Sequence, residues 1–436
     1  MAKNDKGTIR SWAFFDWANS AYNLVITSTI FPAYYTVITT TEAHGDKVDF
    51  FGFQFVNTAL SNYALACAYL VIVLLSPILT SIADYRGNKK IYMKLFTWLG
   101  SIACCGLFFF KLETLELGVI CFALAAIGYA GGFVFYNSYL PEIATVDQQD
   151  AVSAKGFSYG YIGSVILQLI CFLFVLKPEW FGINDPSLPA RLSFLLVGIW
   201  WLGFAQIPFR KLPKGSPNFK ADSGKSLSSG FSELRKVWRQ LKEMSQMKRF
   251  LLAFFLYSMG VQTVMLVAAS FGEKILHLPT SGLIMVILII QLVAIAGANI
   301  MSRLSRVYGN VRVLMAVVFL WVLVCVCAYY ISSAGQFYVM AAVVGLVMGG
   351  IQSLSRSTYS KYIPQATPDT ASFFSFYDIT EKLAIVAGLA SFAFIEELTG
   401  SMRNSTIALT VFFILGLCVL ISLRNMERKA ITAASH

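Results

Sequence analysis

Apolar residues occur in long runs along this chain, and short polar segments separate the runs. A typical run is about 20 residues long, the length that an α-helix needs to cross a hydrocarbon core of roughly 30 Å. Backbone groups in lipid must bond to one another, and the runs lack the polar–apolar alternation of a transmembrane β-barrel. The pattern predicts twelve transmembrane helices, with approximate bounds 12–38, 53–83, 91–110, 117–140, 155–176, 190–209, 249–271, 280–302, 311–332, 336–360, 373–395 and 404–423.

Composition supports an all-α membrane protein. Hydrophobic residues make up 57% of the chain and charged residues 13%, whereas an ordinary soluble domain has roughly 25% charged residues. The eight cysteines lie mainly inside apolar runs without zinc-type spacing, and the three histidines lie in expected outer loops or at the C-terminus. No phosphate-binding glycine loop is present. We expect no metal, no cofactor and no direct use of ATP.

The net charge of +11 is concentrated in one segment. Between Arg210 and Arg249 eleven cations face three acids, which marks 210–248 as a basic linker at the membrane surface rather than a nucleic-acid site. It would join two six-helix halves, 1–209 and 249–436. With the N-terminus inside, 27 of the 34 Lys and Arg lie in inner segments and six in outer loops, so both termini should be cytoplasmic.

Short motifs recur in the two halves. The turn after span 2 and the turn after span 8 share a glycine, an asparagine and a cation at one offset. Spans 4 and 10 each carry two glycines four residues apart, a spacing that lets helices approach closely in lipid. Two six-span halves in parallel repeat form the architecture of the major facilitator superfamily. The paired positions are Gly87/Gly309, Asn88/Asn310, Lys90/Arg312, Gly128/Gly345 and Gly132/Gly349.

Polar residues follow one face of span 1: Asp16, Asn19, Ser20, Asn23 and Thr27. Such a face should turn toward the bundle interior or a water-filled cavity rather than toward lipid. Two interpretations of its carboxylate stay open: it pairs with or caps a neighbouring helix, or it belongs to a gate or substrate site.

Span 10 places Gln352 and Arg356 on one face. The arginine could extend its charge to cytoplasmic water, bind an anionic group of a substrate, or hold a gate. Tyr136 and Asn137 in span 4 and Gln262 in span 7 are further candidates for a cavity, although aromatic residues at such positions more often pack.

Span 11 contains a cation near the membrane midplane. Lys382 lies about 14 Å into the span at 1.5 Å per residue, and Asp378 one turn earlier can neutralise it. Glu381 should point about 100° away from the lysine, because adjacent helical residues diverge. Ionisable groups at this depth are costly and usually functional, but a purely structural ion pair is the alternative. Tyr377 precedes the pair and joins the candidates.

The turn after span 2 holds Asp84, Arg86 and Gly87. The glycine permits a tight turn, and charges at a helix end can bind a neighbouring helix in one conformation and release it in another. We therefore expect this turn to act as a gating loop.

Several longer motifs resemble the vacuole-effluxer-like branch of the major facilitator superfamily, which includes the autophagy-related amino-acid effluxers of fungi. They are FDWANSAY at 15–22, LPEIA at 140–144, GGIQSLSRS at 349–357 and FFSFY at 373–377, followed by Lys382. The resemblance covers both halves and most of the chain. Two positions depart from the family's pattern: Tyr85 interrupts the usual Asp-Arg pair of the gating loop, and Met259 stands where members often have an acid.

The resemblance implies twelve helices around a central cavity lined by spans 1, 4, 7 and 10, and efflux of a small solute such as an amino acid. We expect a monomeric secondary transporter that works by alternating access in a bacterial inner membrane, with a coupling proton or ion. The alternative is a membrane-embedded enzyme or lipid-handling protein that uses its intramembrane Asp and Lys groups.

Overall fold

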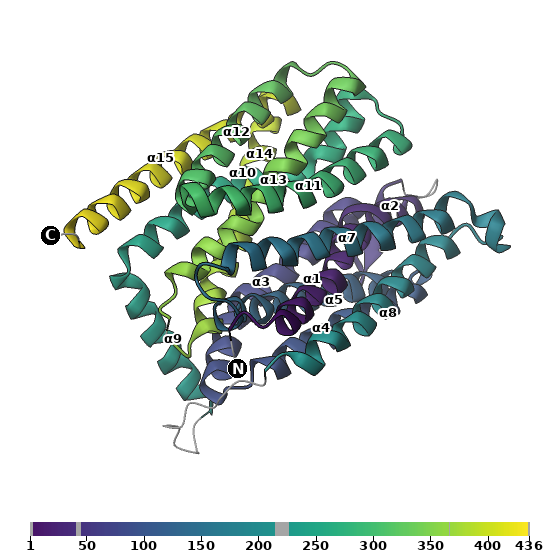
Figure 1. The fold of residues 1–436 in the computed structure, drawn as a ribbon. Helices are drawn as coiled ribbons and strands as arrows, with labels where there is room; N and C mark the ends of the chain where they lie inside the picture. The colour runs from purple at the N-terminus through teal and green to yellow at the C-terminus, as the bar shows by residue number, and fades with distance from the viewer. Residues whose placement is uncertain (1–2, 41–44, 214–225, 366, 435–436) are drawn as a thin grey trace. The chain divides into compact units, whose positions relative to one another are not determined.

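The computed structural model describes residues 3–40, 45–213, 226–365 and 367–434, and almost all of these residues are helical (Figure 1). The linker expected at 210–248 lies partly in 214–225, which is outside the described residues. Residue contacts divide the chain into two compact units. Unit 1 holds Asp5–Asn137 and Tyr159–Gly230, and unit 2 holds Ser138–Ser158 and Phe231–His436 together with a few N-terminal residues.

Ten described helices are long and apolar enough to cross a membrane. Two further described helical segments are consistent with the other two of the twelve spans that the sequence predicts. The first is continuous from residue 6 to residue 39 but is divided by a π-helix, and the second is α14 (Thr370–Thr399), which contains several charged residues. Both are longer than the roughly 20 residues that a spanning helix needs.

Unit 1 is built around the helices of the first half of the sequence. Helix α1 packs on α8, α4 packs on both α5 and α8, and α3 packs on α5. Its helices and strands are α1 (Lys6–Ala21), η1 (Tyr22–Ile30), α2 (Phe31–Thr39), β1 (Lys47–Phe50), β2 (Phe53–Val56), α3 (Asn57–Arg86), α4 (Lys89–Gly106), η2 (Leu107–Phe109), η3 (Leu112–Thr114), α5 (Leu115–Asn137), most of α7 (Gln149–Leu176), η4 (Pro178–Phe181) and α8 (Leu188–Lys211).

Unit 2 repeats this packing. Helix α10 packs on α15, α12 packs on both α13 and α15, and α11 packs on α13, which are the equivalent pairs in the second half. The internal repeat that the sequence predicts is therefore present in the packing. The unit contains α6 (Leu140–Ile143), the first part of α7, most of α9 (Ser226–Glu243), α10 (Ser245–Leu276), α11 (Thr280–Tyr308), α12 (Asn310–Tyr330), α13 (Ala334–Tyr362), α14 and α15 (Met402–Ala434).

The first helical segment begins at a side-chain cap and changes geometry halfway. Asp5 accepts hydrogen bonds from the Thr8 amide at 2.8 Å and the Thr8 hydroxyl at 2.7 Å. These bonds hold the pKa of Asp5 below its usual range. In the π-helix η1, hydroxyls of Ser28 and Thr29 donate to carbonyls five residues earlier, and π-helical turns are frequent at functional sites.

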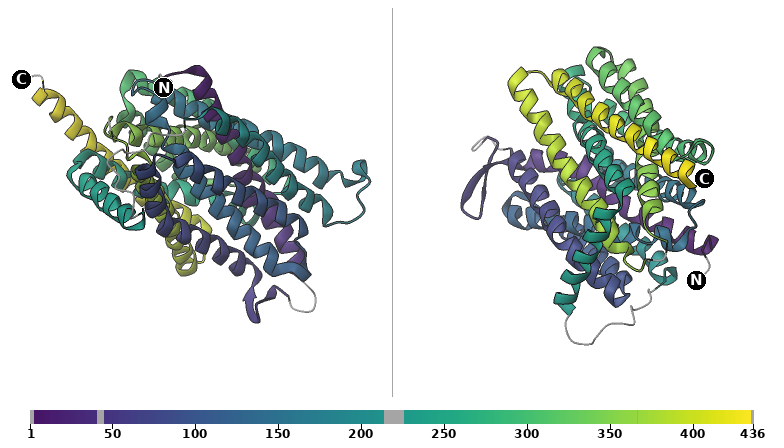
Figure 2. Two further views of the ribbon diagram at one scale, coloured as in Figure 1. Left: turned by 90° about the horizontal axis from the view of Figure 1, so that it is seen from below. Right: turned by 90° about the vertical axis from the view of Figure 1, so that its left-hand side faces the viewer.

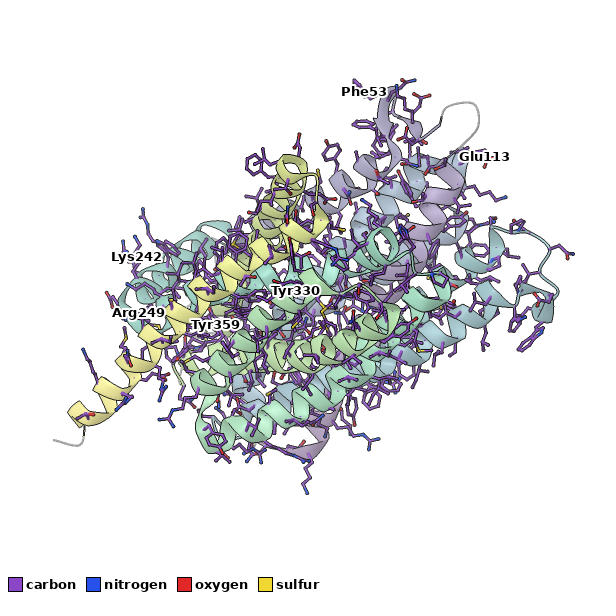
Figure 3. All side chains as sticks on the ribbon, turned by 90° about the horizontal axis from the view of Figure 1, so that it is seen from above. Phe53, Glu113, Lys242, Arg249, Tyr330 and Tyr359 are labelled. Atoms are coloured by element: carbon purple, nitrogen blue, oxygen red, sulfur yellow. The ribbon has the colours of Figure 1, made fainter. Side chains whose placement is uncertain are left out.

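A β-hairpin precedes α3, where the sequence analysis expected span 2 to begin at residue 53. Strands β1 and β2 pair antiparallel, and the loop residues Phe51 and Gly52 both have positive φ, as a tight hairpin turn requires. The apolar content of this stretch comes from phenylalanines in strands, so the expected helix start was wrong by four residues. The hairpin projects from unit 1 (Figure 2), and Phe53 lies at the same end as Glu113 of η3 (Figure 3).

Three of the four glycines in the repeated pairs lie at close helix contacts. A Cβ on Gly128 would stand 2.5 Å from the backbone of Gly100, and one on Gly349 would stand 2.1 Å from the carbonyl of Ala294. Gly345 makes a similar approach to α11. The expectation for Gly132 was wrong, because its nearest neighbours lie 3.6 Å away or farther and leave room for a methyl group.

Candidate functional site

Three ionisable side chains meet on α14. The ammonium of Lys382 lies 3.4 Å from Asp378 and 3.1 Å from Glu381. Gln262 of α10 donates a hydrogen bond to Glu381 at 3.1 Å, so the cluster connects two helices of unit 2. Asp378 and Lys382 are buried, with 3% and 6% of their surface exposed.

The contact between Glu381 and Lys382 corrects one expectation. Adjacent helical residues do leave the backbone in different directions, but the long side chains of glutamate and lysine bend toward each other and close the gap. The cluster holds one cation and two carboxyl groups. With all three ionised it carries one net negative charge, and the uptake of one proton or a monovalent cation would neutralise it.

Aromatic residues join the helices of this cluster to a third helix within unit 2. Tyr377 stacks on Phe254 of α10 at 4.2 Å between ring centroids and lies 5.1 Å from Tyr359 of α13. The hydroxyl of Tyr257 shares a hydrogen bond of 2.7 Å with Ser355. Three helices, α10, α13 and α14, are thus held together around the charged groups, with Gln352 half-buried on α13.

Arg356 is fully buried, so the option that its charge extends to water was wrong. Its guanidinium donates to the Ser153 hydroxyl at 3.0 Å and to the Ser153 carbonyl at 2.8 Å, and it lies over the ring of Phe157. The Ser153 hydroxyl in turn donates to the carbonyl of Ser353 at 2.8 Å. The arginine therefore joins α13 to the first turns of α7, which belong to unit 2.

A second set of charges, which sequence reasoning missed, lies next to this contact. Asp150 of α7 is 2% exposed, and it accepts from Lys361 at 2.6 Å, from Asn310 at 2.7 Å and from Ser305 at 2.9 Å. The partners are 155 to 211 residues away in the sequence. A signal was available, since Asn310 belongs to the repeated turn, but nothing in a single sequence pairs it with Asp150.

The span 1 candidates in unit 1 lie in different environments. Tyr136 of α5 donates a hydrogen bond of 2.6 Å to Asp16, and its ring stacks on Trp12 at 4.4 Å. Asn19 is fully buried, and its amide has no hydrogen-bond partner among the described residues. Asn23 is exposed, so the predicted stripe does not form one continuous buried face.

The remaining candidates lie at the ends of helices. Asn137 is 3% exposed at the end of α5. Gly87 ends α3 with a φ of 62°, which is the left-handed conformation expected for a tight turn after Asp84 and Arg86. Gly309, its counterpart in the repeat, also has a positive φ of 83°. In the part of the chain that the structure describes, no group of three His, Cys, Asp or Glu residues could hold a metal ion.

Solved structures of membrane transporters share this fold. The human organic anion transporter MFSD10 (TETRAN) matches 95% of this chain and 98% of its own with a TM-score of 0.68 at 13% identity. The *E. coli* fucose:proton symporter FucP matches 96% and 98% with a TM-score of 0.69 at 13% identity. The chain therefore has the major facilitator fold, as the sequence predicts.

The family is shown by sequence. The family model described as vacuole effluxer Atg22 like matches residues 4–434, and the chain belongs to this family. A *Bacillus subtilis* relative, the uncharacterized MFS-type transporter YxiO, is 30% identical over 94% of this chain and 93% of its own. Autophagy-related protein 22-1 of *Neosartorya fischeri* is 27% identical over 65% of this chain, which spans about half the length of that relative.

The chain is thus an integral membrane transporter of a solute. Its relatives and structural neighbours are transporters, so the alternative of a membrane-embedded enzyme is set aside.

Proposed function

We propose that this protein is a secondary transporter that moves amino acids or related small metabolites by alternating access. The cluster of Asp378, Glu381 and Lys382, in which the aspartate and the lysine are buried, carries this proposal. Three ionisable groups in one membrane helix are costly to keep, and such groups usually mark a substrate or ion pathway. Carboxyl groups beside an ammonium also offer complementary partners to both ends of a zwitterion.

The same cluster supports a coupling proton. One cation balances one of the two carboxyl groups, so a proton bound by the other would leave the cluster neutral and easier to hold in a low-dielectric interior. Met259 lacks the acid that family members often have in span 7, but Glu381 reaches α10 through Gln262 and brings a carboxyl group to that helix. FucP, a structural neighbour, is named a proton symporter.

The Arg356 and Asp150 contacts support a gate. Both tie the start of α7 to helices of the second half, through directional and charge-assisted hydrogen bonds. A planar guanidinium is suited to bind two acceptors in a fixed geometry and to release both together. We assign this set, with the turn at Asp84, Arg86 and Gly87, to cytoplasmic gating rather than to substrate binding.

The proposal extends to location and assembly. We propose both termini on the cytoplasmic side of a bacterial plasma membrane, with export as the direction and the monomer as the working unit. The excess of Lys and Arg in the inner segments supports this topology.

The first experiment is a ligand screen by thermal unfolding of the purified protein. A transported solute that binds the folded state raises the unfolding temperature. Amino acids that stabilise the wild type but not Lys382→Ala would support the proposal. Stabilisation only by lipids or nucleosides, or equal stabilisation of both proteins by amino acids, would contradict it.

A further inference from the structure

Helix α9 presents two different faces along the residues whose side chains are described. Val237 is fully buried and Leu241 is 6% exposed. Arg235, Arg239 and Lys242 are exposed and fall within about 60° of one another at 100° per residue. Arg235 and Arg239 make no ion pair with any described residue. The helix therefore presents a basic face with no acidic partner in the described part of the chain.

A tryptophan lies at the border between these faces. Trp238 is 45% exposed, and the ammonium of Lys242 lies 5.5 Å from the centre of its ring. Tryptophan is enriched where protein meets the headgroup region, because its ring is apolar and its N–H is polar. A helix with a basic face flanked by tryptophan has the composition of an interfacial helix.

Connectivity keeps α9 at the membrane surface. It ends at Glu243, and α10, a candidate membrane span, begins two residues later at Ser245. Figure 1 draws α9 crosswise to α15, and Figure 3 shows Lys242 and Arg249 at the periphery of unit 2. The basic face thus belongs to a helix that cannot move far from lipid headgroups.

We propose that α9 binds the headgroups of anionic phospholipids through Arg235, Arg239 and Lys242. The bound lipid then stabilises the start of α14 through the ion pair of Lys236 with Asp369. Anionic headgroups are the partner that the charge selects, since basic segments beside a span are attracted to the negative cytoplasmic leaflet. The proposal does not depend on which solute is transported.

The link to α14 consists of two contacts. The ammonium of Lys236 lies 3.0 Å from Asp369, the residue before α14, and Trp238 lies 5.6 Å from Phe376 between ring centroids. Phe376 is two residues before Asp378. Lipid bound to α9 would therefore stabilise the first turns of the helix that carries the charged cluster.

Thermal unfolding in detergent, with added dioleoyl-phosphatidylglycerol or dioleoyl-phosphatidylcholine, tests the binding. We expect the anionic lipid to raise the unfolding temperature more than the zwitterionic lipid, and the difference to shrink at high salt. Each cation near the surface contributes about fivefold in affinity, so R235Q/R239Q/K242Q should weaken the affinity for the anionic lipid roughly 100-fold and reduce its advantage in unfolding temperature over the zwitterionic lipid.

Two matched variants make this test decisive. The variant K47Q/K111Q/K274Q removes three exposed cations elsewhere and should keep the full lipid effect. The variant R235K/R239K/K242R preserves the charge and should keep it too. Binding by α9 is overturned if the α9 glutamine variant keeps the full effect, or if the control variant loses as much.

Hydrogen–deuterium exchange in nanodiscs tests the link. Phosphatidylglycerol, compared with phosphatidylcholine, should slow exchange in α9 and in residues 370–378. The double variant Lys236→Gln with Asp369→Asn should confine this protection to α9. If residues 370–378 show no lipid-dependent protection in the wild type, the link to α14 is wrong. If they keep the full protection in the double variant, transmission through the ion pair of Lys236 with Asp369 is wrong.

Discussion

At the scale of single residues, Lys382 is the group whose removal should be most informative. Lys382→Ala leaves two carboxyl groups without their cation, and breaking a buried pair in this way should cost about 3–5 kcal/mol of stability. Adding Asp378→Asn removes one of the two carboxylates and should recover much of that loss. Thermal unfolding of the single and double variants measures both effects.

The same variants separate a structural role from a functional one. A functional cluster recovers stability in the double variant but not flux, whereas a purely structural pair recovers both. Gln262→Ala provides a comparison for stability, because it removes only the amide that contacts Glu381 and leaves the ion pairs in place. If the losses of Lys382→Ala and of Asp378→Asn alone simply add up in the double variant, Lys382 and Asp378 do not interact.

Arg356 provides a second prediction at this scale. Arg356→Lys keeps the charge but cannot reproduce both bonds to Ser153, so we expect a loss of at least about 1.5 kcal/mol together with slower transport. Ser153→Ala removes one acceptor and keeps the carbonyl, and it should show a smaller loss of the same kind. A lysine variant with normal stability and normal transport would contradict the assigned gate.

At the scale of helices, the glycines of α5 give a matched pair. Gly128→Ala places a methyl group against the backbone of Gly100 and should cost about 1–3 kcal/mol through overpacking. Gly132→Ala meets no close neighbour and should be neutral or slightly stabilising, because alanine is the better helix former. Thermal unfolding compares them, and equal effects of the two changes would contradict the packing described for α5.

Sequence alone predicts the elements well and their contacts poorly. Ten of the described helices follow from hydropathy because lipid leaves the backbone few alternatives. Hydropathy does not predict the hairpin before Asn57 or the π-helix after Ala21, since both depend on local turn and hydroxyl geometry. The proximity of Asp378 and Lys382 follows from helical spacing, but that of Glu381 does not. Contacts such as Asp150 with Lys361 join residues too distant for any periodicity to reveal.

At the scale of the whole molecule, the sequence predicts which side of the membrane the linker occupies. In a cysteine-free version of the chain, Lys225→Cys should resist an impermeant thiol reagent in intact cells and react after the membrane is permeabilised. Lys47→Cys, on an expected outer loop, should react without permeabilisation. Labelling of position 225 from outside would show that the topology is the reverse of the one proposed, although it would not contradict the fold.

The central claim is that the protein transports a zwitterionic solute and that the charged cluster on α14 binds it. Its most direct test is the flux of labelled amino acids in proteoliposomes, comparing the wild type with Lys382→Ala/Asp378→Asn at equal stability and equal reconstitution. The account predicts flux for the wild type and none above empty liposomes for the double variant. Equal flux of an amino acid through both proteins would contradict it.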